Sequence, residues 1–137
     1  MYVLDTNAVS ALMRGDRLVI ERLRQLDRSD VSVPQPVLAE IAYGIARLPR
    51  SRRRAELEAR AETIRGEIPR ADWTDAVSAA FGTIKAALER AGKRIEDFDA
   101  AIAAHALAVH ATLVTANVTH LTRIPGLTVE DWTTSSP

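Results

Sequence analysis

Short apolar runs alternate along this chain with longer segments of helical periodicity, and this alternation constrains the fold more than any other feature. The runs are rich in β-branched residues, so we expect strands at 2–4, 31–33, 112–115 and 127–129, with 67–69 as a minimal edge strand. The periodic segments predict helices at 6–13, 18–26, 36–48, 50–65, 72–91 and 97–110. Strands separated by helices favour an α/β layer fold with a mainly parallel sheet.

Length and composition exclude several classes of protein. A chain of 137 residues corresponds to a single domain, which we place at 1–132, followed by a short flexible tail at 133–137. The absence of cysteine excludes disulfides and thiolate metal ligands, and the zero net charge excludes a uniformly basic nucleic-acid binder. The N-terminus does not resemble a signal peptide, and the most apolar stretch, at 100–109, is half the length of a membrane span. We therefore expect a soluble, cytoplasmic protein.

Two sets of apolar residues are expected to face the core. The aromatic set is Trp73, Phe81 and Trp132. The inner face of the charged helix at 50–65 is expected to be Ala55, Leu57, Ala61 and Ile64.

Three acidic residues stand beside apolar segments, where an isolated carboxylate is costly. Asp5 follows the first predicted strand, Glu40 borders the apolar stripe of the helix after the second strand, and Asp99 lies in the first turn of the Ala-rich helix. In parallel sheets function gathers at the carboxyl ends of the strands. Carboxylates gathered there repel one another, and a hard divalent cation such as Mg²⁺ relieves that repulsion.

Each acid also has a purely structural interpretation. Asp5 is suited to cap the helix that begins at Thr6, and Glu40 is suited to a solvated helix surface. Asp99 is the hardest to explain in this way, because its face of the helix is otherwise apolar. The spacing alone leaves both the metal site and the structural roles open.

Five short motifs follow one another along nearly the whole chain. They are Val3-Leu4-Asp5-Thr6-Asn7, Val37-Leu38-Ala39-Glu40-Ile41-Ala42-Tyr43-Gly44, Asp97-Phe98-Asp99-Ala100-Ala101-Ile102-Ala103-Ala104, Leu113-Val114-Thr115-Ala116-Asn117 and Ile124-Pro125-Gly126-Leu127. Each motif is weak alone, but the ordered set resembles the PIN-domain ribonucleases. The most similar group is the VapC-type toxins of bacterial type II toxin–antitoxin pairs.

The resemblance implies a three-layer α/β/α sandwich with a mainly parallel, four- to five-stranded sheet. It implies a toxin that hydrolyses RNA phosphodiester bonds with Mg²⁺ (or Mn²⁺), with Asp5 and Asp99 as the main ligands. Glu40 then binds the metal through water or positions the attacking water. Thr6 either adds a hydroxyl contact or serves the first helical turn. The resemblance also implies a cognate antitoxin and a homodimer.

Two positions depart from the family pattern. Many members carry a fourth acid after the strand that ends near Thr115, but this chain has Asn117 there, and His120 where an Asp often follows. Asn117 can accept a hydrogen bond from a metal-bound water but brings no charge. We therefore expect Asn117 to belong to the catalytic set of a site with one tightly held ion.

Arginines form the main basic feature of the chain. Residues 47–70 contain eight arginines and four glutamates, and the cluster 47–54 stands out. This cluster either contacts RNA phosphates or forms a solvated helix face with local ion pairs, and the pattern favours the second. The candidate substrate-binding residues are Thr6, Arg14 and Arg50.

Three other functions are weighed against a metal-dependent nuclease. Phosphotransfer through an aspartyl phosphate on Asp5 usually requires an acid two residues later, where this chain has Asn7. A catalytically weakened module that binds RNA or a partner is kept open by Asn117. Metal-independent cleavage by histidines is disfavoured, because no spacing brings two of the three together.

Overall fold

A single five-stranded sheet, in which all neighbouring strands are parallel, forms the centre of the molecule. The computed structural model describes residues 1–134, so the predicted tail at 133–137 lies largely outside the described residues. The strands are β1 (Tyr2–Leu4), β2 (Val31–Pro34), β3 (Arg70–Ala71), β4 (Thr112–Val114) and β5 (Thr128–Glu130). Their order is β3-β2-β1-β4-β5, which places β1 in the middle.

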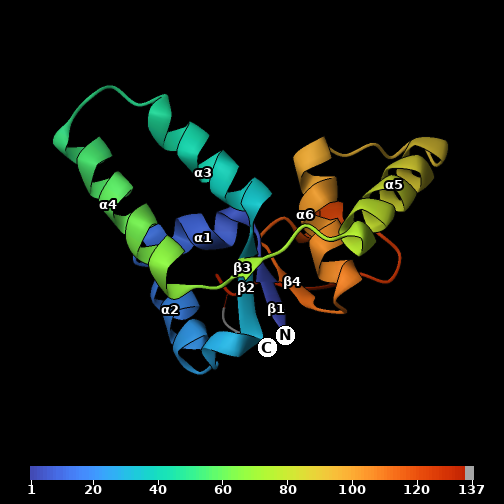
Figure 1. The fold of residues 1–137 in the computed structure, drawn as a ribbon, viewed down its shortest axis with the longest axis horizontal. Coiled ribbons are helices and arrows are strands. Elements are labelled where there is room, and N and C mark those ends of the chain that lie inside the picture. Colours follow the sequence, from blue (N-terminus) through green and yellow to red (C-terminus); the bar gives the residue numbers. More distant parts are fainter. Residues whose placement is uncertain (135–137) are drawn as a thin grey trace.

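Helices cover both faces of this sheet. They are α1 (Thr6–Met13), α2 (Arg17–Arg24), α3 (Gln35–Ala46), α4 (Arg52–Glu67), α5 (Asp75–Arg90), α6 (Asp97–Ala108) and α7 (Val118–Leu121), with a 3₁₀ turn at Arg28–Asp30. Figure 1 shows α1, α2 and α4 on one side of the sheet and α5 and α6 on the other. The predicted three-layer α/β/α architecture is therefore confirmed.

The core lies around the central strands and α6. Val3, Leu4, Leu113 and Val114 have almost no exposed surface. Every residue of α6 from 100 to 106 is buried, since the helix lies between the sheet and α5. This explains the Ala-rich sequence of α6, because a helix that is buried on all sides needs small apolar residues all round.

The strand order creates a switch point at β1. The chain reaches β2 on one side of β1 and β4 on the other, and ligands in open parallel sheets bind beyond the carboxyl ends of the strands at such a point. Figure 1 shows that α3 starts where β2 ends and that α6 starts at the same end of the molecule. Residues that follow β1 and β4, and those in the first turn of α6, therefore gather at one edge.

The start of α5 differs from the prediction. We expected a helix from residue 72 with Trp73 in the core, but α5 begins at Asp75, because the Thr74 hydroxyl accepts the N–H of Val77 and caps the helix. Trp73 precedes the helix and is 48% exposed, with its ring edge-on to His105. Phe81 is half-buried and Trp132 is buried.

Two further predictions were partly wrong. Leu57, Ala61 and Ile64 of α4 do pack against the core, but Ala55 is exposed, since α4 meets the molecule only along a narrow strip. The edge strand lies at 70–71 instead of 67–69, because β2 pairs with those residues.

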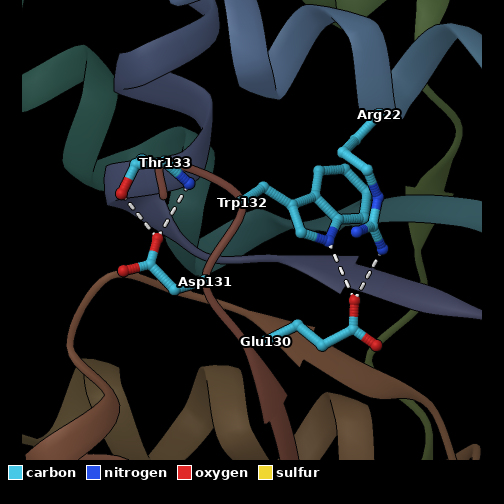
Figure 2. Close-up of polar contacts among 5 residues, drawn as sticks. All are labelled: Arg22, Glu130, Asp131, Trp132 and Thr133. Atoms are coloured by element: carbon cyan, nitrogen blue, oxygen red, sulfur yellow. Dashed lines mark hydrogen bonds and ion pairs between the residues drawn. The ribbon is translucent and has the colours of Figure 1, made fainter. Parts of the chain in front are cut away.

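Strand β5, at one edge of the sheet, is joined to α2 by side-chain contacts. Glu130 Oε1 accepts hydrogen bonds from the Arg22 guanidinium at 2.8 Å and from the Trp132 indole at 3.1 Å, as Figure 2 shows. The Arg22 guanidinium also lies over the Trp132 ring, which packs edge-on against Tyr2. This Arg22–Glu130–Trp132 clamp joins β5 to α2 and to β1.

No helix within residues 1–134 has both the length and the apolar character that crossing a membrane requires.

Candidate functional site

Asp5 is a buried carboxylate that is held by three hydrogen-bond donors. Its Oδ1 accepts the N–H of Thr6 at 2.7 Å, and this contact caps α1. Its Oδ2 accepts the Thr115 hydroxyl at 2.8 Å and the side-chain amide of Asn7 at 3.1 Å. The side chain is only 4% exposed, so these donors replace the water that Asp5 has lost. Asp5 therefore caps α1, as its structural interpretation predicted, and this contact also fixes the orientation of its carboxylate at the switch point.

Asn7 and Thr115 form a network that the sequence did not single out. Asn7 Nδ2 also donates to Thr115 Oγ1, and Asn7 Oδ1 accepts the N–H of Ala116 at 2.6 Å. Thr115 Oγ1 in turn accepts the N–H of Asn117 at 2.9 Å. The network joins the ends of β1 and β4 and fixes Asp5 relative to the loop that carries Asn117. The available signal in the sequence was that both side chains are polar and lie at or just after the end of a predicted strand.

Glu40 enters the site from α3. It is half-buried, and its Oε1 accepts a hydrogen bond from the Thr6 hydroxyl. The backbone N–H of Thr6 binds Asp5 while its side chain binds Glu40. Thr6 therefore couples two of the predicted acids.

Asp99 completes the acidic set from the first turn of α6. Its pKa is raised to about 6, first because the carboxyl is partly buried and then because Asp5 and Glu40 bring negative charge near it. Glu96 adds to this rise, whereas His120 opposes it. The three acids that the sequence singled out are thus close enough to repel one another, although they come from three separate parts of the chain.

A hollow of about 760 Å³ opens over this edge of the sheet. Glu40, Asp99, Asn117 and His120 line it, together with residues of the loop before α6 and its first turn. The Oδ1 of Asn117 lies 3.0 Å from Nδ1 of His120. The two positions at which the chain departs from the family pattern therefore contact each other and face the acids.

The other histidines lie elsewhere. His105 is buried in α6, where its Nδ1 lies 2.8 Å from the carbonyl oxygen of Ala101, and burial lowers its pKa. His110 follows the end of α6 with a positive φ of 55°. Within residues 1–134, His120 is therefore the one histidine that lines the acidic hollow.

The candidate substrate-binding arginines separate in the structure. Arg14 lines a hollow of about 350 Å³ together with Thr6, Glu40 and Arg53. Arg50 lines a different hollow, which contains none of the predicted acids.

Local ion pairs occupy part of the arginine-rich segment. Arg54 binds Glu58, and Arg65 binds Glu62, at 3.1 and 2.7 Å. For these two arginines the solvated-face interpretation is the right one.

The donor set of the site fits a hard divalent cation. Asp5, Glu40, Asp99 and Asn117 all carry oxygen atoms, and the pKa of Asp99 is raised first by burial and then by the charges of Asp5 and Glu40, which a cation would offset. In the conformation described for residues 1–134, no three Asp, Glu or His side chains are gathered tightly enough to ligate one ion. Glu40 and Asp99 line the hollow, whereas both carboxylate oxygens of the buried Asp5 accept hydrogen bonds from Thr6, Asn7 and Thr115.

Comparison with known proteins shows what this chain is similar to. The model of the PIN domain family matches residues 2–127. Ribonuclease VapC2 of Rickettsia felis is 30% identical over 134 residues, which cover 96% of this chain and 98% of that protein. The tRNA(fMet)-specific endonuclease VapC of Shigella flexneri is 28% identical over 96% of this chain and 97% of its own length. The crystal structure of VapBC2 from Rickettsia felis, bound to a DNA fragment from the promoter, superposes with a TM-score of 0.85 at 28% identity, over 96% of this chain and 98% of that one.

Proposed function

Because the chain belongs to the PIN domain family, we propose that it is a metal-dependent endoribonuclease and the toxin of a VapC-type toxin–antitoxin pair. The observation that carries the proposal is the convergence of Asp5, Glu40 and Asp99, in which burial first, and then the charges of Asp5 and Glu40, raise the pKa of Asp99. The family match covers the segments that supply all three residues. We take residues 1–132 as one PIN-like domain.

The proposed reaction is hydrolysis of an RNA phosphodiester bond. Asp5, Asp99 and Glu40 would hold Mg²⁺ or Mn²⁺, and a bound divalent ion lowers the pKa of a water and stabilises charge on the phosphate. The oxygen of a water forms a bond to phosphorus as the bond to the 3′-oxygen breaks. The products are a 5′-phosphate and a 3′-hydroxyl.

The chain's own residues orient this chemistry. Thr115 and Asn7 fix the Asp5 carboxylate, and Thr6 occupies Oε1 of Glu40, which leaves Oε2 to accept a hydrogen bond from the attacking water. Asn117 replaces an acid with a neutral amide, and this lower negative charge favours one ion over two.

The partner proposals rest on relatives. A solved relative is a VapBC complex, so a cognate antitoxin that covers the acidic edge is the expected partner. A homodimer in the cytoplasm and an RNA substrate complete the proposal, and one relative is named as a tRNA(fMet)-specific endonuclease.

Purified protein tests the proposal directly. We expect RNA cleavage with Mg²⁺ or Mn²⁺ that disappears in excess chelator and in Asp5→Asn. Glu89→Gln, an exposed acid near the end of α5, is the matched control and should cleave normally. Cleavage that persists in excess chelator would favour histidine chemistry, and RNA binding without cleavage under any metal would favour a weakened binding module. Labelled phosphate on Asp5 would favour phosphotransfer.

A further inference from the structure

An exposed aromatic ring stands at the rim of the acidic hollow. Phe98 is 45% exposed although it belongs to α6, whose residues from 100 to 106 are all buried. Phe98 lines the same hollow as Glu40 and Asp99. The other large apolar side chains that are strongly exposed within residues 1–134 line none of the hollows described there: Met1, Tyr43, Trp73 and Val109.

A single exposed apolar residue is normal on a protein surface, so exposure alone does not indicate a binding site. The neighbours of Phe98 are what distinguish it. Phe98 directly precedes Asp99, and consecutive Cα atoms are about 3.8 Å apart. Both side chains line the same hollow, so a group that stacks on the ring lies in the hollow that the Asp99 carboxylate also lines.

Cations share this rim with the ring. Arg94 and Lys85 both line the hollow. Lys85 pairs with Asp97 at 3.0 Å, whereas Arg94 pairs with no carboxylate in the part of the chain that the structure describes. An exposed guanidinium beside acids is suited to bind an anion that approaches from solution.

We propose that Phe98 and Arg94 form a nucleotide subsite in which an unpaired RNA base stacks on the Phe98 ring and Arg94 contacts a neighbouring phosphate. An exposed ring and an arginine that line one hollow match the chemistry of a single-stranded nucleotide, which offers the flat face of its base and the negative charge of its phosphate. A base that is paired in a duplex cannot present its face to the ring. The subsite therefore selects unpaired RNA at the cleavage position, and this inference rests on the proposed nuclease function.

Binding by the full chain tests the subsite. The parent is Asp5→Asn, which is expected to hold RNA without cutting it, and the probe is a single-stranded RNA whose cleavage position in wild type has been mapped. A 2-aminopurine base next to that position reports stacking by its fluorescence. We expect Phe98→Ala and Phe98→Leu to bind about tenfold more weakly and to lose the quenching, whereas Phe98→Trp keeps both. Val109→Ala removes an exposed apolar side chain just after α6 and should bind like the parent.

The contribution of Arg94 is measured separately, through the salt dependence of RNA binding. Arg94→Gln should weaken binding by a similar factor for every sequence and lower the slope of log affinity against log salt by about 0.7. The same probe in a full duplex should bind equally to the Asp5→Asn parent and to the parent that also carries Phe98→Leu, because no base face is free.

The outcomes separate this inference from the proposed function. If wild type cleaves RNA and Phe98→Leu binds and cleaves equally well, the subsite is wrong and the nuclease stands. If Phe98→Leu alters dimer size or antitoxin binding but leaves RNA affinity unchanged, the ring faces a protein and the subsite is wrong. If wild type neither binds nor cleaves RNA with any divalent ion, the proposed function fails and the subsite fails with it.

Discussion

The ionised carboxylate of Asp99 lowers the stability of the folded protein, and its proposed role in binding a cation explains why the residue is there. Its pKa lies at about 6 in the fold, against 3.8 for a free carboxyl. Between these values the folded protein retains a proton that the unfolded chain releases, so the free energy of unfolding falls as the pH rises from about 4 to about 6. Above that range the full penalty remains, because the ionised carboxylate is partly buried and also lies near Asp5 and Glu40.

Asp99→Asn should therefore stabilise the metal-free protein at pH 7.5. Two pKa units correspond to nearly 3 kcal/mol, and solvent screening of this half-buried group reduces the expected gain to about 1 kcal/mol. The gain should shrink at pH 4, where the wild-type carboxyl is protonated in the fold. Urea unfolding in chelator at both pH values measures it.

The neighbouring Asp97 provides the control for this measurement. Asp97 is exposed and pairs with Lys85, so Asp97→Asn should leave stability unchanged or lower it slightly. A lower stability of Asp99→Asn at pH 7.5 would show that Asp99 is structurally favourable and would remove the electrostatic argument for a cation.

The sequence revealed the acids of the site but not their support. Asp5, Glu40 and Asp99 stood out because carboxylates beside apolar segments are costly. Asn7 and Thr115 did not stand out, because a polar side chain after a strand is common, and their role depends on β1 pairing with β4 across more than a hundred residues. Only the strand order brings these two residues together.

At the scale of elements, periodicity located each long helix, and local capping decided its limits. Thr74 starts α5 later than the apolar pattern indicates, and Ser51 similarly starts α4 at Arg52. The four-residue helix α7 was not predicted, because so short a segment shows no period. Ala55 was misplaced because the position of α4 depends on tertiary packing and its sequence is highly charged.

The Arg22–Glu130–Trp132 clamp allows a prediction about elements. Trp132 is 2% exposed, so Trp132→Ala should lower the free energy of unfolding by about 3–5 kcal/mol. Glu130→Gln retains an acceptor for the indole and loses only a partly exposed ion pair, so it should cost about 1 kcal/mol or less. Chemical denaturation of both variants measures the difference, and equal losses would mean that the ion pair, and not ring burial, holds β5 to α2.

The clamp also reaches the site through the backbone. The N–H of Thr115 donates to the carbonyl of Glu130 at 2.9 Å, and the hydroxyl of Thr115 holds Asp5. The end of β5 is therefore one hydrogen bond away from the residue that orients the central carboxylate.

At the scale of the molecule, zero net charge conceals a separation of charge. Asp5, Glu40 and Asp99 gather at the carboxyl edge of the sheet. Residues 47–70, in contrast, carry eight arginines and four glutamates. Arg54 and Arg65 are paired with glutamates, which reduces the cationic surface that a polyanion can use. A negatively charged RNA must therefore approach an acidic edge by way of particular arginines.

Substitution of the two candidate arginines, Arg14 and Arg50, tests along which surface RNA reaches the site. Arg14 shares a hollow with Glu40, whereas Arg50 lines a hollow without any acid of the site. We expect Arg14→Gln in the Asp5→Asn parent to weaken single-stranded RNA binding and to lower the salt slope by about 0.7, because one phosphate contact is lost. Arg50→Gln has the same charge change and should leave both quantities nearly unchanged. Equal effects of the two variants would mean that RNA senses the total charge of the molecule, and a larger effect of Arg50→Gln would place the path of the strand along α4.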